Sequence, residues 1–93
     1  MNSEFQVITD ASNIAIGGIL EQNGKVVTYS IKVLNKAEQK YSTYELEALA
    51  ILNALKTWRH YLLGKSFTIY TDHEPLKWIL KNKIGNGRVV RWI

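Results

Sequence analysis

The segment VITDASNIAIGGIL, residues 7–20, decides the fold, because an apolar run in it ends at a carboxylate and the chain then returns through glycines. Residues 5–9 have the apolar and β-branched composition of a strand, and Asp10 follows them directly. The pair Gly17-Gly18 lies inside the next apolar run, where glycines typically mark a bulge or a close backbone approach. We therefore expect a carboxylate at the end of the first strand, beside a place where another backbone can come near.

The following residues predict two more strands and a long helix. Residues 14–21 and 25–32 read as strands, and the Asn-Gly dipeptide at 23–24 is a strong signal for a hairpin between them. Apolar residues at helical spacing then predict a helix from residue 42 to about residue 63, which ends at Gly64. The apolar stripe of this helix is expected to consist of Tyr44, Ala48, Ile51, Leu55, Trp58 and Leu62.

A second Thr-Asp ending follows the helix. Residues 66–71 predict a fourth strand that is followed by Asp72, and residues 75–80 predict a short second helix. Strand-helix-strand crossovers are right-handed in nearly all proteins, so the fourth strand should lie parallel to the first and beside it. Ligands bind beyond the carboxyl ends of such strands, which places Asp10 and Asp72 at one edge. The order β-β-β-α-β-α thus predicts an α/β mixed sheet.

Two carboxylates on neighbouring strands, ~4.8 Å apart, need either a raised pKa or a cation between them. Taken alone, an Asp after a strand is more often a turn former or a helix cap, but the pair at one edge favours a site for Mg²⁺, which prefers carboxylate oxygens. The long helix offers Glu45 and Glu47 as a third ligand. Rotation places Glu47 roughly 60° from the centre of the apolar stripe and Glu45 about 100° away on the other side. Glu45 also completes the capping box STYE with Ser42, so Glu47 is the better candidate.

Composition limits the class of protein. Ninety-three residues with 46% hydrophobic content predict a single small folded domain over residues 1–93. The sequence has no cysteine, no visible signal peptide and no apolar run near the ~20 residues of a membrane span. The net charge is +4, and five cations follow Glu74 without any acid: Lys77, Lys81, Lys83, Arg88 and Arg91. These cations fit a polyanionic partner and an ordinary solvated face about equally well.

Several motifs in order resemble a known family. TDAS with IGGIL, AEQKYSTYELEALAI, WRHYLLG, TDHEPLKWIL and GRVVRW together are similar to the ribonuclease H domain of reverse transcriptases from gypsy-like LTR retrotransposons. The resemblance implies a ribonuclease H-like fold and hydrolysis of the RNA strand of RNA–DNA hybrids with two Mg²⁺ ions, for which Mn²⁺ can substitute. It also implies that Asp10, Glu47 and Asp72 are the catalytic, metal-binding residues, with Asp10 in the central position.

The resemblance carries further expectations. It implies an RNA–DNA hybrid as partner, the polymerase part of a larger polyprotein beside this domain, no membrane, and an intracellular location in the cytoplasm, a virus-like particle or the nucleus. The family continues with another helix, strand and fourth carboxylate, whereas this sequence stops at Ile93, so the fold is expected to be truncated and cleavage weakened. The alternative is a catalytically silent module that binds nucleic acid or serves structure. A phosphotransferase would need a second glycine-rich phosphate loop, which is missing here.

Overall fold

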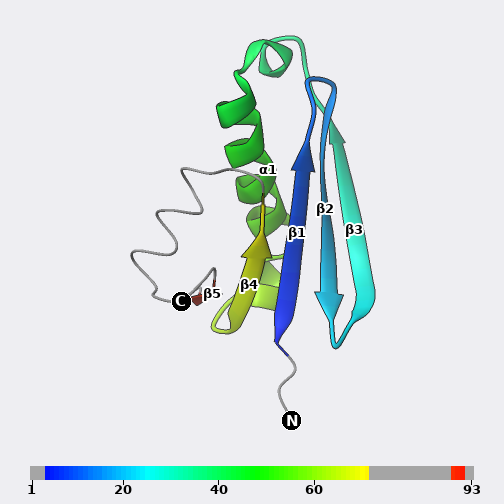
Figure 1. Ribbon diagram of the computed structural model, residues 1–93, viewed down its shortest axis with the longest axis vertical. Helices are drawn as coiled ribbons and strands as arrows, with labels where there is room; N and C mark the ends of the chain where they lie inside the picture. The colour runs from blue at the N-terminus through cyan, green and yellow to red at the C-terminus, as the bar shows by residue number, and fades with distance from the viewer. Residues whose placement is uncertain (1–3, 72–88, 92–93) are drawn as a thin grey trace.

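A computed structural model describes residues 4–71 and 89–91 of the chain. The elements in chain order are β1 (Phe5–Ala11), β2 (Ala15–Gln22), β3 (Lys25–Val33), the 3-10 helix η1 (Glu38–Lys40), α1 (Thr43–Thr57), α2 (Arg59–Leu62), β4 (Ser66–Tyr70) and β5 (Val89–Arg91). The strands form one sheet in the order β3-β2-β1-β4-β5, and the helices lie along one face of it (Figure 1).

The strand pairing confirms the expected mixed sheet. β1 pairs antiparallel with β2 and parallel with β4, and β2 pairs antiparallel with β3. The hairpin between β2 and β3 turns at Asn23 (φ 56°) and Gly24 (φ 76°), which are both left-handed as a tight hairpin turn requires. β5, which the sequence did not predict as a strand of the sheet, pairs antiparallel with β4. The expected helix over 75–80 and the residue Asp72 lie outside the described residues.

The long helix begins as predicted but is interrupted before its predicted end. The Ser42 hydroxyl accepts a hydrogen bond from the Glu45 amide at 3.2 Å, and the Glu45 carboxylate accepts one from the Ser42 amide at 2.9 Å. The prediction of one helix to about residue 63 was wrong, because Trp58 leaves helical geometry (φ −106°, ψ 22°) and separates α1 from α2. Gly64, with φ 77°, follows α2 as a C-terminal glycine should.

The apolar stripe also differs from the prediction. Tyr44 is 54% exposed and does not belong to the core. The buried face instead consists of Leu46, Ala50, Ile51, Ala54, Trp58 and Leu62. Four of these follow a row of every fourth residue from Leu46 to Trp58, and this row packs against core residues of the sheet. Periodicity alone identified an amphipathic helix but assigned its first turn to the wrong side.

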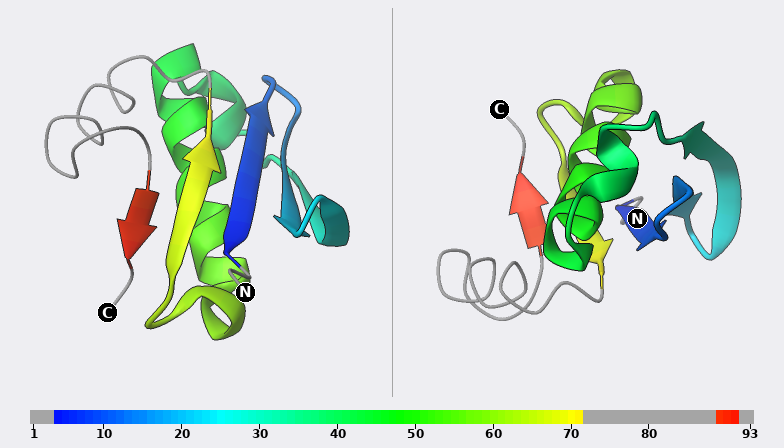
Figure 2. Two further views of the ribbon diagram at one scale, coloured as in Figure 1. Left: turned by 60° about the horizontal axis from the view of Figure 1, so that its bottom comes forward. Right: turned by 90° about the horizontal axis from the view of Figure 1, so that it is seen from above.

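The core lies between the helices and one face of the sheet, as the turned views show (Figure 2). Its main cluster joins alternate residues of β1, β2 and β4 to the helices: Phe5, Val7, Leu20, Ile51, Ala54, Trp58, Leu62, Phe67 and Ile69. A second cluster of Ile16, Leu34, Leu46 and Ala50 closes the end near the start of α1. In the part of the chain that the structure describes, no helix covers the other face of the sheet.

Gly18 is the point of closest approach between the helices and β2. A Cβ atom there would lie 3.0 Å from Cη2 and 3.3 Å from Cζ3 of Trp58. At Gly17, on the opposite face, a Cβ would meet only the Ser30 carbonyl oxygen at 3.5 Å, an ordinary contact. The expected close approach is therefore real at Gly18, but the neighbour is an indole of the same chain. The ladder irregularity lies further along, between Leu20 and Glu21, and not at the glycine pair.

Glu38 ties η1 to β3. Its carboxylate accepts hydrogen bonds from the Asn35 amide at 2.9 Å and from the Lys32 ammonium at 3.0 Å, and its own amide donates to the Asn35 side chain at 2.8 Å. The backbone hydrogen bond from Asn35, followed by the Lys32 contact, lowers the pKa of Glu38 below its ordinary value of 4.5. The ionised carboxylate thus holds the connection between the sheet and α1.

We predict that Gly18→Ala destabilises the fold by about 1–3 kcal/mol, whereas Gly17→Ala costs less than about 1 kcal/mol. Both changes add one methyl group within the same strand, but only the first meets a side chain that is 2% exposed and has no room to move. Urea denaturation followed by tryptophan fluorescence measures both values. Equal losses of stability in the two variants would contradict the packing of Trp58 on Gly18.

The Glu38 contacts predict a pH dependence. A carboxylate whose pKa is lowered by folding stabilises the native state above its unfolded pKa of 4.5, and this contribution is lost as the pH falls through the folded value. We expect Glu38→Gln to lower the free energy of unfolding at pH 7 and to flatten its decline below pH 4.5. Denaturation curves from pH 3 to pH 7 test this, and Glu21→Gln serves as a control. An unchanged acid limb in Glu38→Gln would contradict the assignment.

Candidate functional site

Asp10 lies near the end of the central strand. β1 continues through Ala11, one residue beyond the aspartate, because Asp10 pairs with Gly17 and Ala11 with Ile16. The Asp10 side chain is exposed, and its Oδ1 accepts a hydrogen bond from the Ala11 amide at 3.0 Å. The aspartate therefore pairs within the ladder and has an exposed side chain.

Glu47 approaches Asp10 from the helix. It lies two residues after the capping-box residue Glu45 in α1 and is half-buried, whereas Glu45 is exposed and bound to Ser42. A hollow of about 10 Å³ is lined by Thr9, Asp10, Ala11, Glu47, Ala50 and Thr71. Asp10 and Glu47 thus share one small space between the sheet edge and the helix, and Glu45 has no part in it. The expected division of roles between the two glutamates is consistent with this geometry.

The end of β4 reaches the same hollow. β4 runs parallel to β1 with Tyr70 opposite Ile8, so both strands leave the sheet at one edge. Thr71, the residue after β4, is 9% exposed and lines the hollow with Asp10 and Glu47. Asp72 is the next residue and lies outside the described residues, so its convergence with the other two carboxylates stays a prediction.

Sequence reasoning missed the two threonines. Thr9 and Thr71 both line the hollow, and each precedes an aspartate in the repeated Thr-Asp dipeptide. The repeat drew attention to the carboxylates, but strand alternation in β1 turns Thr9 toward the face opposite that of Asp10. In β1 that face is the one covered by the helix, so a threonine hydroxyl in this position could have been expected beside Glu47.

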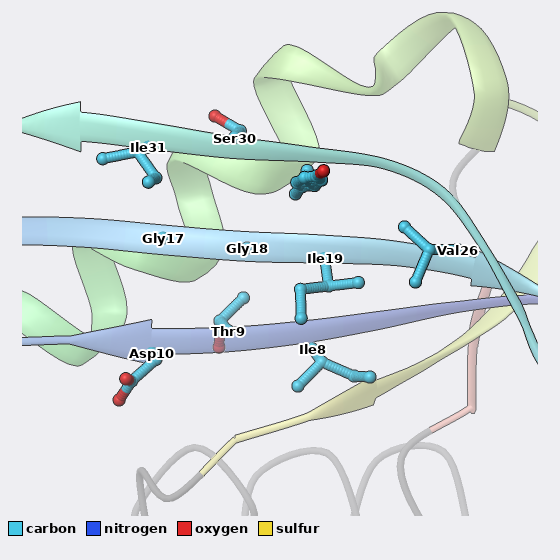
Figure 3. A pocket seen from close by; sticks show the side chains of 10 residues that line it. Ile8, Thr9, Asp10, Gly17, Gly18, Ile19, Val26, Ser30 and Ile31 are labelled. Atoms are coloured by element: carbon cyan, nitrogen blue, oxygen red, sulfur yellow. The ribbon is translucent and has the colours of Figure 1, made fainter.

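Asp10 also borders the open face of the sheet. A hollow of about 540 Å³ extends over β1, β2 and β3, with Asp10 and Gly17 at one end and Tyr29 and Val26 among its apolar walls (Figure 3). A second hollow of about 230 Å³ adjoins it around Ser12 and Gly17. Gly17 pairs with Asp10 and has no side chain, so no side chain rises from the sheet surface at that position beside the Asp10 carboxylate. A bulky group can therefore approach this carboxylate from the open face.

The donor set fits a hard divalent cation. The hollow offers carboxylate oxygens from Asp10 and Glu47 and hydroxyl oxygens from Thr9 and Thr71, and the chain has no cysteine. Oxygen donors of this kind suit Mg²⁺ or Mn²⁺, and a volume of about 10 Å³ matches one water-sized occupant. Within residues 4–71 and 89–91, no three histidine, cysteine or acidic side chains come together. Asp72, the third ligand predicted from the sequence, lies outside these residues.

None of the helices in the described part of the chain is long and apolar enough to cross a membrane.

Comparison with known proteins identifies the family. All 93 residues match the family described as the RNase H-like domain found in reverse transcriptase. The chain is 46% identical over 89 residues to the retrovirus-related Pol polyprotein from transposon 297 of Drosophila melanogaster, covering 96% of this chain and 8% of that protein. It is 38% identical to the gypsy Pol polyprotein of the same fly, covering 95% and 9% respectively, and 40% identical to the transposon Tf2-3 polyprotein of Schizosaccharomyces pombe, covering 90% and 7%.

The chain thus spans less than a tenth of the length of these relatives. The match extends over the whole chain, and the mixed sheet with its crossover helix agrees with it. The chain belongs to the RNase H-like domain family of reverse transcriptases.

Proposed function

We propose that this chain is a metal-dependent endonuclease domain that hydrolyses the RNA strand of RNA–DNA hybrids within a retroelement Pol polyprotein. The single observation that supports this most strongly is the shared hollow of Asp10 and Glu47 at the carboxyl edge of the parallel strands β1 and β4. The relatives' names, which are those of Pol polyproteins, support the polyprotein context. Such a domain would work inside the cell, in the cytoplasm, a virus-like particle or the nucleus.

Each carboxylate has a different role in this proposal. Asp10 is exposed at the rim between the small hollow and the open face, so it can contact both a cation and the group that approaches over Gly17. Glu47 is half-buried and anchored by α1, so it fixes the position of the site relative to the sheet. Asp72, expected one residue after Thr71, would supply the third carboxylate.

Mg²⁺ or Mn²⁺ would be held by Asp10, Glu47 and Asp72. When bound, the metal supplies an activated water and stabilises charge on the phosphate oxygens. The hydroxyls of Thr9 and Thr71 line the same space and can orient the carboxylates or their waters. The side chains around the hollow exclude bulk water on the helix side, where Ala50 is 2% exposed.

The substrate would arrive from the open face. Asp10 faces a low surface at Gly17, which lets a sugar-phosphate backbone come within reach of the carboxylate. The net charge of +4 is compatible with a polyanionic substrate, and contacts to phosphates alone would bind hybrids with little dependence on sequence. The 2′-hydroxyls of one strand then provide the chemical mark that distinguishes RNA from DNA.

We predict that Asp10→Asn and Glu47→Gln each lower the rate of RNA cleavage by about 100-fold or more, because each removes an anionic metal ligand. Glu45→Gln is the matched control, since glutamine also completes a capping box and this residue does not line the hollow. The assay uses a labelled RNA–DNA hybrid with Mg²⁺ and with Mn²⁺, and the polyprotein that we propose contains the domain.

Single-stranded RNA and duplex DNA serve as substrate controls in that assay. Cleavage by Asp10→Asn at the rate of the unchanged protein would refute the proposed site. Hybrid binding without cleavage in either metal would instead favour a silent nucleic-acid-binding module.

A second prediction separates the two glutamates without an activity readout. Mg²⁺ that binds the native state alone raises the melting temperature. We expect Glu47→Gln to lose this metal-dependent rise. Glu45→Ala should lower the melting temperature with or without metal, by the equivalent of about 1 kcal/mol or less, and keep the rise. Thermal melts with and without MgCl₂ measure both effects, and equal metal responses in the two variants would contradict the division of roles.

A further inference from the structure

β3 combines an open sheet edge with exposed apolar side chains. On the face away from the helices it presents Tyr29, Ile31 and Val33, which are 69%, 79% and 71% exposed. Alternate residues of a strand share a face, so the three form one row along the strand. Single exposed apolar residues are common on protein surfaces, but a row of them on an edge strand is a surface that favours pairing.

The outer edge of β3 has no strand beside it in the part of the chain that the structure describes. β3 is the terminal strand of the sheet and pairs only with β2, as its position at the outside of Figure 1 shows. Its outward backbone amides and carbonyls therefore form a ready template for another strand. The apolar floor beside it, lined by Ile8 and Ile19 among others, continues from β3 across the sheet (Figure 3).

Residues 29–33 carry few of the usual protections of a sheet edge. Natural edges are blunted by proline, lysine or a bulge. This stretch has no proline, and the ladder irregularity opposite Leu20 and Glu21 lies at the other end of the strand. Its single lysine, Lys32, has its ammonium 3.0 Å from the Glu38 carboxylate, so its charge is directed to a partner within the chain.

We propose that the outer edge of β3 pairs antiparallel with β3 of a second copy of this chain, about a twofold axis that passes beside Ile31. In this register Ile31 faces Ile31, and Tyr29 faces Val33 in both directions. These are β-branched and aromatic pairs of the kind that stabilise antiparallel strands. Lys32 faces Ser30, so no like charges oppose each other. The surface is complementary to itself, as a twofold interface requires.

A second copy fits this edge better than a charged partner. The row offers apolar contact and backbone hydrogen bonds, and the only ionic side chain of residues 29–33, Lys32, is already bound to Glu38. Two copies joined here would form one continuous sheet, with the apolar hollows of both on the same side. Each copy has a net charge of +4, so salt should strengthen the pairing by screening this repulsion. Binding to nucleic acid has the opposite dependence on salt.

Sedimentation equilibrium of the nucleic-acid-free chain over a wide concentration range tests the proposal. We expect a monomer–dimer equilibrium that shifts toward dimer with added salt. Ile31→Lys places two ammonium groups opposite each other and should raise the dissociation constant by about tenfold or more. The matched control is Leu52→Lys on α1, where the side chain is 63% exposed and far from β3 in sequence, and it should leave the constant unchanged.

The register is tested by a pair of changes. Tyr29→Lys alone and Val33→Glu alone should each weaken the dimer. Both changes in one chain put a cation opposite an anion twice across the axis and should restore part of the affinity. Circular dichroism checks that every variant is folded. A chain that stays monomeric at all concentrations, an Ile31→Lys dimer as tight as that of Leu52→Lys, or a double variant weaker than both single ones would overturn the proposal.

Discussion

Parallel pairing of β4 with β1 requires the chain to cross from one end of the sheet to the other, and α1 and α2 make this crossing. Two consequences follow from the crossover. Both strands end at the same edge, which brings Thr71 next to Asp10. The helix that makes the connection must lie on the sheet, which brings Glu47 to that edge as well. The candidate site is therefore a product of the connection and does not depend on an elaborate loop.

The same crossover explains the asymmetry of the sheet. Its buried face is formed by Val7, Leu20 and Phe67, each fully buried, against the helices. The described residues provide no second layer, so the opposite face keeps its apolar residues in contact with solvent. One face thus supplies the core of the domain, and the other leaves apolar side chains exposed. Asp10 lines both the small hollow beside the helix and the larger hollow on the open face. It is therefore fixed in position by the sheet and still accessible to a ligand from solvent.

Local signals predicted most of the elements. The Asn-Gly turn, the capping box of Ser42 and Glu45, and Gly64 each act within a few residues, so their effect is readable from the sequence. The choice of Glu47 over Glu45 also followed from local geometry, and Glu47 lines the small hollow with Asp10 whereas Glu45 is bound in the capping box. A catalytic or metal-binding role for Glu47 stays a prediction. The family resemblance agreed with the whole-chain match.

Other features depend on contacts between distant residues and could not be read locally. The break at Trp58 and its packing on Gly18 involve residues forty positions apart, and the true buried face of α1 is set by the sheet beneath it. Thr9 and Thr71 line the hollow only because the fold brings β1, β4 and α1 together, and no local sequence pattern indicates this. Asp72 and the helix expected over 75–80 remain predictions from the sequence.

The position of β1 in the sheet has a consequence for how the domain comes apart. β1 has a strand on both sides and the helix over one face, whereas β3 is bound along one edge only. Amide protons of the central strand can exchange with solvent only when most of the sheet has opened, while those of an outer strand exchange after local fraying. Asp10 pairs with Gly17 just beyond the stretch Phe5–Ile8 that has a strand on both sides, so it is anchored at the end of the segment expected to exchange most slowly. Substitutions that loosen the periphery should leave its geometry intact, and those that disturb it should do so by weakening the whole fold.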